Sequence, residues 1–313
     1  MTPELGPPFE VLQPETGSVP LVLSSPHSGE IYPPSLLSAI RIQFNQLRCL
    51  EDAWVDQLFG CATELGAPLL RARFARAYVD PNREAFELDA ALFDGPLPAY
   101  VNAGSVKARA GLGTIPSRIG GRTIYRARLD FGEAERRIRL AYWPYHQALQ
   151  SLLVRARHQF GAVLLLDCHS MPSFAGNGAA SQEGSVDFAL GDRFGRSCAP
   201  AIIERVETAL RARGFRVARN RPYAGGHITA RYGQPETGVH ALQIEVRRGL
   251  FMEERTREPH PAVADLQRVL RELLTDLGDF VGEQYALRPA VLASASCSAP
   301  AGQGQPGSGS AVR

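Results

Sequence analysis

The sequence predicts an α/β fold with a largely parallel sheet, built as one domain. Short β-rich runs lie at residues 19–24, 77–80, 162–168, 215–218 and 240–246. They alternate with segments whose apolar residues recur at helical spacing, which is typical of a parallel sheet with helices packed on it. No linker-like segment divides the interior, so we expect a single α/β domain over residues 1–288. Residues 289–313 are rich in Ala, Ser, Gly and Pro and predict a disordered tail.

Three segments have the periodicity of amphipathic helices. The first begins near Glu133 and reaches Phe160, and Pro144 within it predicts either a kink or a junction of two helices. The second spans about residues 199–213 and ends at Gly214, which suits a left-handed C-cap. The third spans about residues 261–284 and carries a stripe of leucines.

Composition excludes several classes of function. The 34 basic and 32 acidic residues are too balanced for a protein whose main partner is nucleic acid. No apolar run approaches the roughly 20 residues of a membrane span, and the five cysteines form no C-x-x-C pair. We therefore expect a cytoplasmic protein that acts on a small molecule, without a nucleic-acid or membrane partner. The sequence does not indicate an oligomeric state, and Lys107, the only lysine, receives no function from composition.

Polar side chains end three of the predicted strands. LVLSSPHSGE places His27 after an apolar run, and AVLLLDCHS ends in Asp167 and His169. VHALQIEVRR carries Gln243 and Glu245 on one face, because residues two apart on a strand point the same way. In α/β sheets ligands bind outside the carboxyl ends of the strands. The sequence therefore predicts a site at that edge.

Two histidines and one carboxylate would form a three-ligand zinc site with an open position for water. Such a zinc lowers the pKa of its water to about 7. Glu245 would then accept the water proton, and Asp167 would hold a metal-bound imidazole by its other N–H. Each residue could instead be structural. However, burying a carboxylate in a core strand without a partner costs several kcal/mol. Polar residues at the ends of three predicted strands therefore favour a site over coincidence.

The third metal ligand has two candidates. HSGE gives His27 and Glu30 the H-x-x-E spacing used by zinc carboxypeptidases. CLEDAWVDQLF offers Asp52 just before a helical pattern. Asp52 could instead cap that helix, and Glu30 could be an exposed loop residue.

RAYVDPNRE suggests a site for a substrate carboxylate. Arg83 supplies a planar fork for a carboxylate, and Asn82 adds an amide contact next to it. The Asp-Pro-Asn sequence also favours a turn, and both interpretations can hold. A second anionic group could meet an arginine, and the candidates are Arg73, Arg76, Arg231 and Arg247. The glycine-rich segment 222–238 lacks dinucleotide-binding spacing and is interpreted as a loop over the site.

Taken in order, these motifs resemble the N-formylglutamate amidohydrolase family. The matching segments are SSPHSG, EDAWVDQLF, RAYVDPNRE, YHQAL, LLDCHSMPS, GGHITARYG and VHALQIEV. The resemblance implies a zinc-carboxypeptidase-like (phosphorylase/hydrolase-like) fold, related to aspartoacylase, in which a mixed, mostly parallel sheet has helices on both faces. It also implies a metal-dependent hydrolase that cleaves the linear amide of N-formyl-L-glutamate to formate and L-glutamate, a terminal step of histidine degradation.

The resemblance assigns roles to individual residues. His27 and His169 match metal ligands, and it favours Asp52 over Glu30 as the third ligand of one divalent ion, expected to be zinc. Asn82 and Arg83 match an element that holds the substrate carboxylate, and Glu245 matches a proton-shuttling glutamate. His227 stands where the family often has an aromatic residue, which affects the substrate contacts of its loop.

Three alternatives remain open on the sequence. A related zinc enzyme could cleave another N-acyl amino acid or a small peptide. A non-catalytic protein could bind carboxylates through the arginine alone. A serine or cysteine hydrolase could use Ser170 or Cys168 beside His169, but the sequence has no G-x-S-x-G elbow, and Cys168 is expected to face away from His169.

Overall fold

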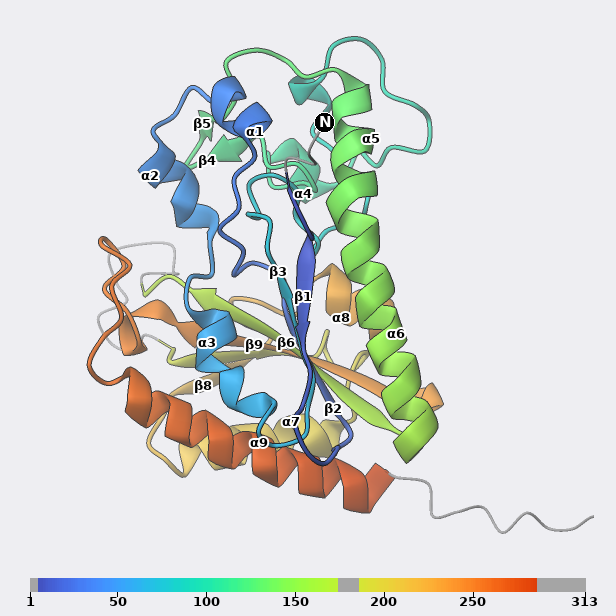
Figure 1. The fold of residues 1–313 in the computed structure, drawn as a ribbon, viewed down its shortest axis with the longest axis vertical. Coiled ribbons are helices and arrows are strands. Elements are labelled where there is room, and N and C mark those ends of the chain that lie inside the picture. The colour runs from blue at the N-terminus through green and yellow to red at the C-terminus, as the bar shows by residue number, and fades with distance from the viewer. Residues whose placement is uncertain (1–4, 174–185, 286–313) are drawn as a thin grey trace, which may run out of the picture.

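Seven strands form the central sheet of the computed structural model, which describes residues 5–173 and 186–285 (Figure 1). They are β1 (Phe9–Leu12), β2 (Leu21–Ser25), β3 (Leu69–Ala72), β6 (Val163–Met171), β7 (Phe188–Gly191), β8 (Val217–Arg219) and β9 (Val239–Arg247). Across the sheet they lie in the order β1-β3-β2-β6-β9-β7-β8. A separate hairpin pairs β4 (Arg118–Ile119) with β5 (Arg122–Thr123).

The α-helices are α1 (Pro34–Ala39), α2 (Phe44–Leu47), α3 (Val55–Leu58), α4 (Val106–Arg109), α5 (Phe131–Arg137), α6 (Trp143–Phe160), α7 (Pro200–Arg211), α8 (His227–Tyr232) and α9 (Val263–Tyr285). Short 3₁₀ turns are η1 (Arg48–Leu50), η2 (Gly60–Ala62), η3 (Ala90–Leu92), η5 (Pro235–Thr237) and η6 (Arg248–Leu250). All three helices predicted from periodicity are present, as α5 with α6, as α7 and as α9. Gly214 has φ +85°, the left-handed conformation expected after α7.

The sheet is mixed and mostly parallel, as predicted. β3, β2, β6 and β9 run in one direction. β1 is antiparallel to β3 at one edge, and β7, with β8 parallel to it, is antiparallel to β9 at the other. The four parallel strands therefore form the middle of the sheet, where their carboxyl ends share an edge.

Helices cover both faces of this sheet, which confirms the expected layers. On one face Tyr145 and Leu149 of α6 belong to a buried cluster with Val22 and Leu165. On the other face Leu164 and Leu166 of β6 pack in a cluster with residues of α3, α7 and α9. Figure 1 shows α6 and α9 on opposite sides of the strands. Alternation along β6 sends Leu165, Asp167 and His169 toward the α6 face.

The helix predicted from Glu133 to Phe160 is continuous but not uniform. A π-helical turn, η4 (Ile138–Tyr142), joins α5 to α6. Pro144 lies in the first turn of α6. A proline has no N–H to give to the i−4 carbonyl, and the wider π turn accommodates that missing hydrogen bond. The junction replaces the sharp break that the proline alone would predict.

The predicted strand at residues 77–80 is wrong. This segment is a turn followed by irregular chain. Tyr78 and Val79 are fully buried, but the N–H of Asp80 bonds to the carbonyl of Thr114 instead of a neighbouring strand. β1, β3 and β7 were not predicted. Arg71, which forms a part-buried ion pair with Glu10 of β1, interrupts the apolar pattern of β3 and conceals its strand character.

Two further expectations concern the tail and membrane-spanning helices. The predicted tail, residues 289–313, lies outside the described residues. Within residues 5–173 and 186–285, no helix is long and apolar enough to cross a membrane.

The chain after β2 approaches the extension of β3 at Gly29. A Cβ atom at this position would lie 2.1 Å from the carbonyl oxygen of Phe74. Two hydrogen bonds hold the segments together there, from Ile31 N to Arg73 O and from Ala75 N to Ile31 O, both 2.9 Å. Only glycine fits this contact without moving the backbone.

We predict that Gly29→Ala destabilises the protein by about 1–3 kcal/mol, because the added methyl group must push two hydrogen-bonded segments apart. Urea unfolding measures the effect. Gly60→Ala is the matched control, since a Cβ at Gly60 meets nothing within 4 Å. Equal stability of the two variants would contradict the close approach.

Candidate metal centre and active site

The carboxyl ends of β2, β6 and β9 lie side by side, because these three neighbouring strands are parallel. His27 comes two residues after β2. In the register between β6 and β9, His169 lies opposite Glu245 and Asp167 lies opposite Gln243. The polar strand ends therefore gather at one edge of the sheet, as the sequence predicts.

His27, Asp52 and His169 form a group that could hold a metal ion. One ligand atom from each lies within 4.8 Å of the others. The Oδ2 atom of Asp52 is 3.2 Å from Nδ1 of His27 and 3.0 Å from Nδ1 of His169. All three side chains are buried. Two imidazoles and one carboxylate are a donor set that suits zinc, with a position left for water or substrate.

Glu30, the alternative third ligand, does not belong to this group. Its side chain is 68% exposed, and its contact is an ion pair with Arg48 at 3.4 Å. Asp52 is not a helix cap either. The N-cap of α3 is Trp54, and no side chain caps that helix.

Each imidazole also contacts a second carboxylate through its other ring nitrogen. Nε2 of His27 is 2.8 Å from Asp80 Oδ1, and Nε2 of His169 is 3.0 Å from Asp167 Oδ2. These contacts keep the hydrogen on Nε2, so Nδ1 is free to face a cation. The Asp167 contact is the one expected from the sequence. The sequence predicts only a turn at Asp80, so its contact with Nε2 of His27 is a finding of the structure.

The charges of the group match metal binding. Burial alone would raise the pKa of Asp52, but the His169 and His27 imidazoles hold it well below its usual range. Burial alone would lower the pKa of His169, but the neighbouring carboxylates, Asp167 first, raise it well above its usual range. The carboxylates around His169 thus favour positive charge at this position, which is the charge that a metal ion would supply.

Arg248 and Ser170 occupy the other oxygen of Asp52. Nη2 of Arg248 and Oγ of Ser170 each donate to Oδ1 at 3.1 Å. Nε of Arg248 also donates to Oγ of Ser170 at 3.1 Å. Oδ1 is thereby committed, and Oδ2 alone points toward the two histidines.

Glu245 lies next to the group with the character of a base. Burial raises its pKa from 4.5 to about 7, and the nearby Asp52 carboxylate adds to the shift. Nε2 of Gln243 donates to its Oε1 at 2.8 Å and orients the carboxyl group. A pKa close to the working pH is what general base catalysis favours.

A cavity of about 550 Å³ opens on these residues. The metal group and Glu245 line it. So do six cationic or amide side chains: Arg76, Asn82, Arg83, Lys107, Gln243 and Arg248. The volume is in the range of small-molecule sites.

Asn82 and Arg83 lie in the cavity wall, where the sequence predicts the substrate carboxylate. Nε of Arg83 donates to the carbonyl of Leu112 at 2.8 Å and Nη1 donates to the carbonyl of Asn82 at 3.0 Å. Nδ2 of Asn82 donates to Asp167 Oδ2 at 3.2 Å and lies 3.0 Å from His169 Nε2. When Nε2 of His169 carries hydrogen it cannot accept, so Asn82 keeps one amide hydrogen for another acceptor.

Of the four arginines considered for a second anion, Arg76 alone lines this cavity. Its Nε donates to Asp80 Oδ2 at 2.7 Å. Arg73 and Arg231 line other hollows, and Arg247 pairs with Asp187 at 2.7 Å.

The glycine-rich segment reaches the site, as expected. Residues 222–226 line the cavity, and α8 follows. Gly226 donates its N–H to Gln243 Oε1 at 2.8 Å, and a Cβ there would lie 2.4 Å from Oδ1 of Asn82. His227 is not part of the cavity wall.

The geometry disfavours a serine or cysteine nucleophile. Cys168 packs among the leucines of the opposite face, and burial raises the pKa of its thiol well above the usual range. Oγ of Ser170 bonds to Asp52 and Arg248. No hydrogen bond joins it to a histidine within the described parts of the chain.

Sequence reasoning missed Arg248 and Lys107 as residues of the site. A signal existed for Arg248, because two arginines directly follow the strand that carries Glu245. Lys107 gave no signal, because α4 lies far along the chain from every predicted strand end.

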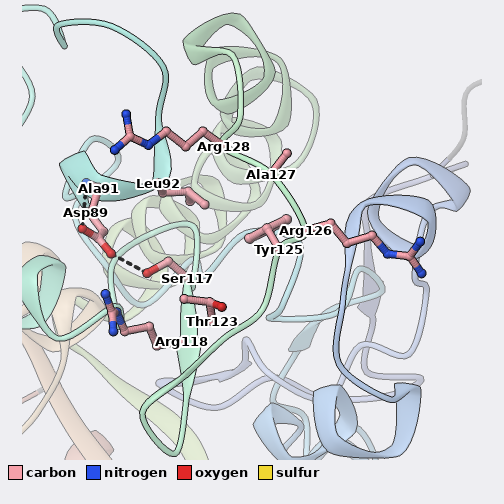
Figure 2. A pocket seen from close by; sticks show the side chains of 10 residues that line it. All are labelled: Asp89, Ala91, Leu92, Ser117, Arg118, Thr123, Tyr125, Arg126, Ala127 and Arg128. Atoms are coloured by element: carbon pink, nitrogen blue, oxygen red, sulfur yellow. Dashed lines mark hydrogen bonds between the residues drawn. The ribbon is translucent and has the colours of Figure 1, made fainter.

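A second hollow of about 170 Å³ lies beside the β4–β5 hairpin (Figure 2). Its one lining carboxylate, Asp89, accepts from Ala91 N at 3.0 Å and from Ser117 Oγ at 2.6 Å. Figure 2 shows the guanidinium of Arg126 directed away from the other side chains. No histidine or cysteine is among its described lining residues, so the larger cavity is the candidate active site.

Comparisons with known proteins identify the family of the chain. Residues 19–252 match the family model described as N-formylglutamate amidohydrolase. An N-formylglutamate deformylase of Pseudomonas aeruginosa is 35% identical over 288 residues, 88% of this chain and 99% of that protein. One from Pseudomonas putida is 34% identical, over 88% of this chain and 98% of that protein.

The fold is shared with a crystal structure of N-formylglutamate amidohydrolase from Ralstonia eutropha JMP134. The TM-score is 0.83 at 39% identity, over 88% of this chain and 99% of that one. A gene product of Agrobacterium tumefaciens, 19% identical with a TM-score of 0.60 over 88% of this chain and 96% of that one, shares the fold. The motif order, the grouped strand ends and these relatives lead to one conclusion: the chain belongs to the N-formylglutamate amidohydrolase family.

Proposed function

We propose that this protein hydrolyses N-formyl-L-glutamate to formate and L-glutamate. The observation that carries the proposal is the gathering of His27, Asp52 and His169 beside Glu245 in one cavity of a chain from this family. The proposal includes zinc as the metal, histidine degradation as the source of the substrate and the cytoplasm as the site of reaction.

His27, Asp52 and His169 would hold the zinc ion. When bound there, zinc would make water nucleophilic near neutral pH and polarise the formyl carbonyl. Asp80 and Asp167 keep the imidazoles oriented, and Arg248 keeps Asp52 turned toward them.

Glu245 would move the proton. Its carboxylate accepts a proton from the attacking water and later gives it to the leaving amine nitrogen. Burial lifts its pKa to about 7, so it can do both near neutral pH. Arg83 and Asn82 would hold a substrate carboxylate, which fixes the amide at attacking distance.

Removal of the metal tests the centre. We predict that a chelator abolishes formate release from N-formylglutamate and that added zinc restores it. Without the metal ion, no group among the three ligands would activate the attacking water. Formate is measured enzymatically, and metal content is measured in parallel. Activity that persists in fully metal-free protein would contradict the proposal.

Glu245→Gln should lower kcat by about 100- to 10,000-fold while zinc content stays unchanged, because the amide keeps the shape but cannot take a proton. Glu236→Gln is the matched control, since Glu236 is exposed on η5 just before the same strand.

The pH profile gives a second measure of Glu245. The base must be ionised, so kcat/KM should rise with pH through its pKa and then level. A bound cation lowers that pKa, so the acidic limb should lie at or below about pH 7. Undiminished turnover in Glu245→Gln would remove this residue as the base.

Arg83→Ala should lower kcat/KM by about 10- to 100-fold for formyl amino acids with a free carboxylate, because a hydrogen bond to a charged group contributes about 1.5–3 kcal/mol. Formyl amino acid amides should lose much less. Arg73→Ala serves as control, since Arg73 is exposed and lines a different hollow. Equal losses on charged and uncharged substrates would contradict the carboxylate contact.

A further inference from the structure

Four cationic side chains line the active-site cavity: Arg76, Arg83, Lys107 and Arg248. Two of them are neutralised within the site. Arg76 pairs with Asp80 at 2.7 Å, and Arg248 pairs with Asp52 at 3.1 Å. The positive charge of the other two has no such close carboxylate.

Arg83 gives its hydrogen bonds to backbone carbonyls and comes no closer than 4.0 Å to Asp80. The ammonium group of Lys107 has neither a hydrogen bond nor an ion pair with any described residue. Although Lys107 as a residue is exposed, partial desolvation by neighbouring atoms lowers its pKa, and the positive charges of Arg83 and Arg76 lower it further. The lysine and the arginines therefore share one electrostatic environment.

The fold places Lys107 and Arg83 on the same wall. Nε of Arg83 donates to the carbonyl of Leu112, and the N–H of Leu112 donates to the carbonyl of Lys107, both at 2.8 Å. Ser105 caps α4 by accepting from Ala108 N at 2.9 Å, and Ala108 is fully buried. The helix that carries Lys107 is thus anchored beside Arg83.

We propose that Lys107 binds the side-chain carboxylate of an N-acyl dicarboxylic amino acid while Arg83 binds its α-carboxylate. This inference rests on the proposed function and assigns to Lys107 the selection of the second carboxylate at the same site. Two cations without a carboxylate within hydrogen-bond distance match a substrate with two carboxylates. The planar fork of Arg83 suits the fixed α-carboxylate, and the flexible point charge of Lys107 suits one at the end of a side chain.

The geometry also explains why none of the arginines considered from sequence takes this role. Arg76 is committed to Asp80, and the other three lie outside the cavity. The second anion therefore meets the single lysine of the chain, not an arginine.

The test compares N-formylglutamate with N-formylglutamine, which has nearly the same shape without the second charge. Wild-type enzyme should prefer N-formylglutamate. Lys107→Met should lower kcat/KM on N-formylglutamate by about 10- to 100-fold, mainly through KM, and leave N-formylglutamine nearly unchanged. Arg109→Met is the matched control, since Arg109 lies on the same helix, is exposed and does not line the cavity.

The outcomes separate the inference from the function beneath it. A wild-type enzyme that hydrolyses N-formylglutamate, with a substrate preference unchanged in Lys107→Met, overturns the role of Lys107 alone. A zinc-loaded wild type that releases no formate overturns the proposed function and this inference with it. Lys107 is exposed, so Lys107→Met should fold normally, and an unchanged Tm verifies that KM reports binding.

Discussion

One carboxylate oxygen holds the site together. Oδ2 of Asp52 lies within 3.2 Å of Nδ1 of both His27 and His169, from segments far apart in the sequence. Its partner oxygen is occupied by Ser170 and Arg248, so the carboxylate cannot turn away. All these groups except the half-buried Arg248 are buried, where an unpaired charge costs several kcal/mol. The hydrogen bonds that pair these buried groups also leave Nδ1 of His27, Nδ1 of His169 and Oδ2 of Asp52 facing one point.

The parallel strands bring these residues together, and burial shifts the pKa values of their side chains. β2, β6 and β9 end at one edge, so His27, His169 and Glu245 converge without long loops. Burial raises the pKa of Glu245 to about 7, whereas the two imidazoles beside Asp52 outweigh the same effect of burial and hold its pKa well below the usual range. The pKa values of these two carboxyl groups thus move in opposite directions because their partners differ, which supports the different roles proposed for them.

The sequence allowed prediction of those features that local patterns control. Apolar runs marked β2 and β6, alternating apolar and polar residues marked β9, and polar residues near the ends of these strands marked the site. Residues 77–80 were misassigned because their burial comes from tertiary packing, which a local pattern cannot distinguish from a strand. Arg248 and Lys107 were missed for a related reason. Arg248 contacts Asp52, which lies 196 residues earlier in the sequence. Lys107 lines the cavity because the long segment between β3 and β6 folds back over the site.

The most direct test of the central claim is a crystal structure of the zinc-loaded protein, with anomalous scattering measured at the zinc edge. We expect one strong peak about 2.0–2.2 Å from Nδ1 of His27, Nδ1 of His169 and Oδ2 of Asp52, with Glu245 beside the open position. A peak bound by Nε2 atoms, or one away from these three residues, would contradict the claim.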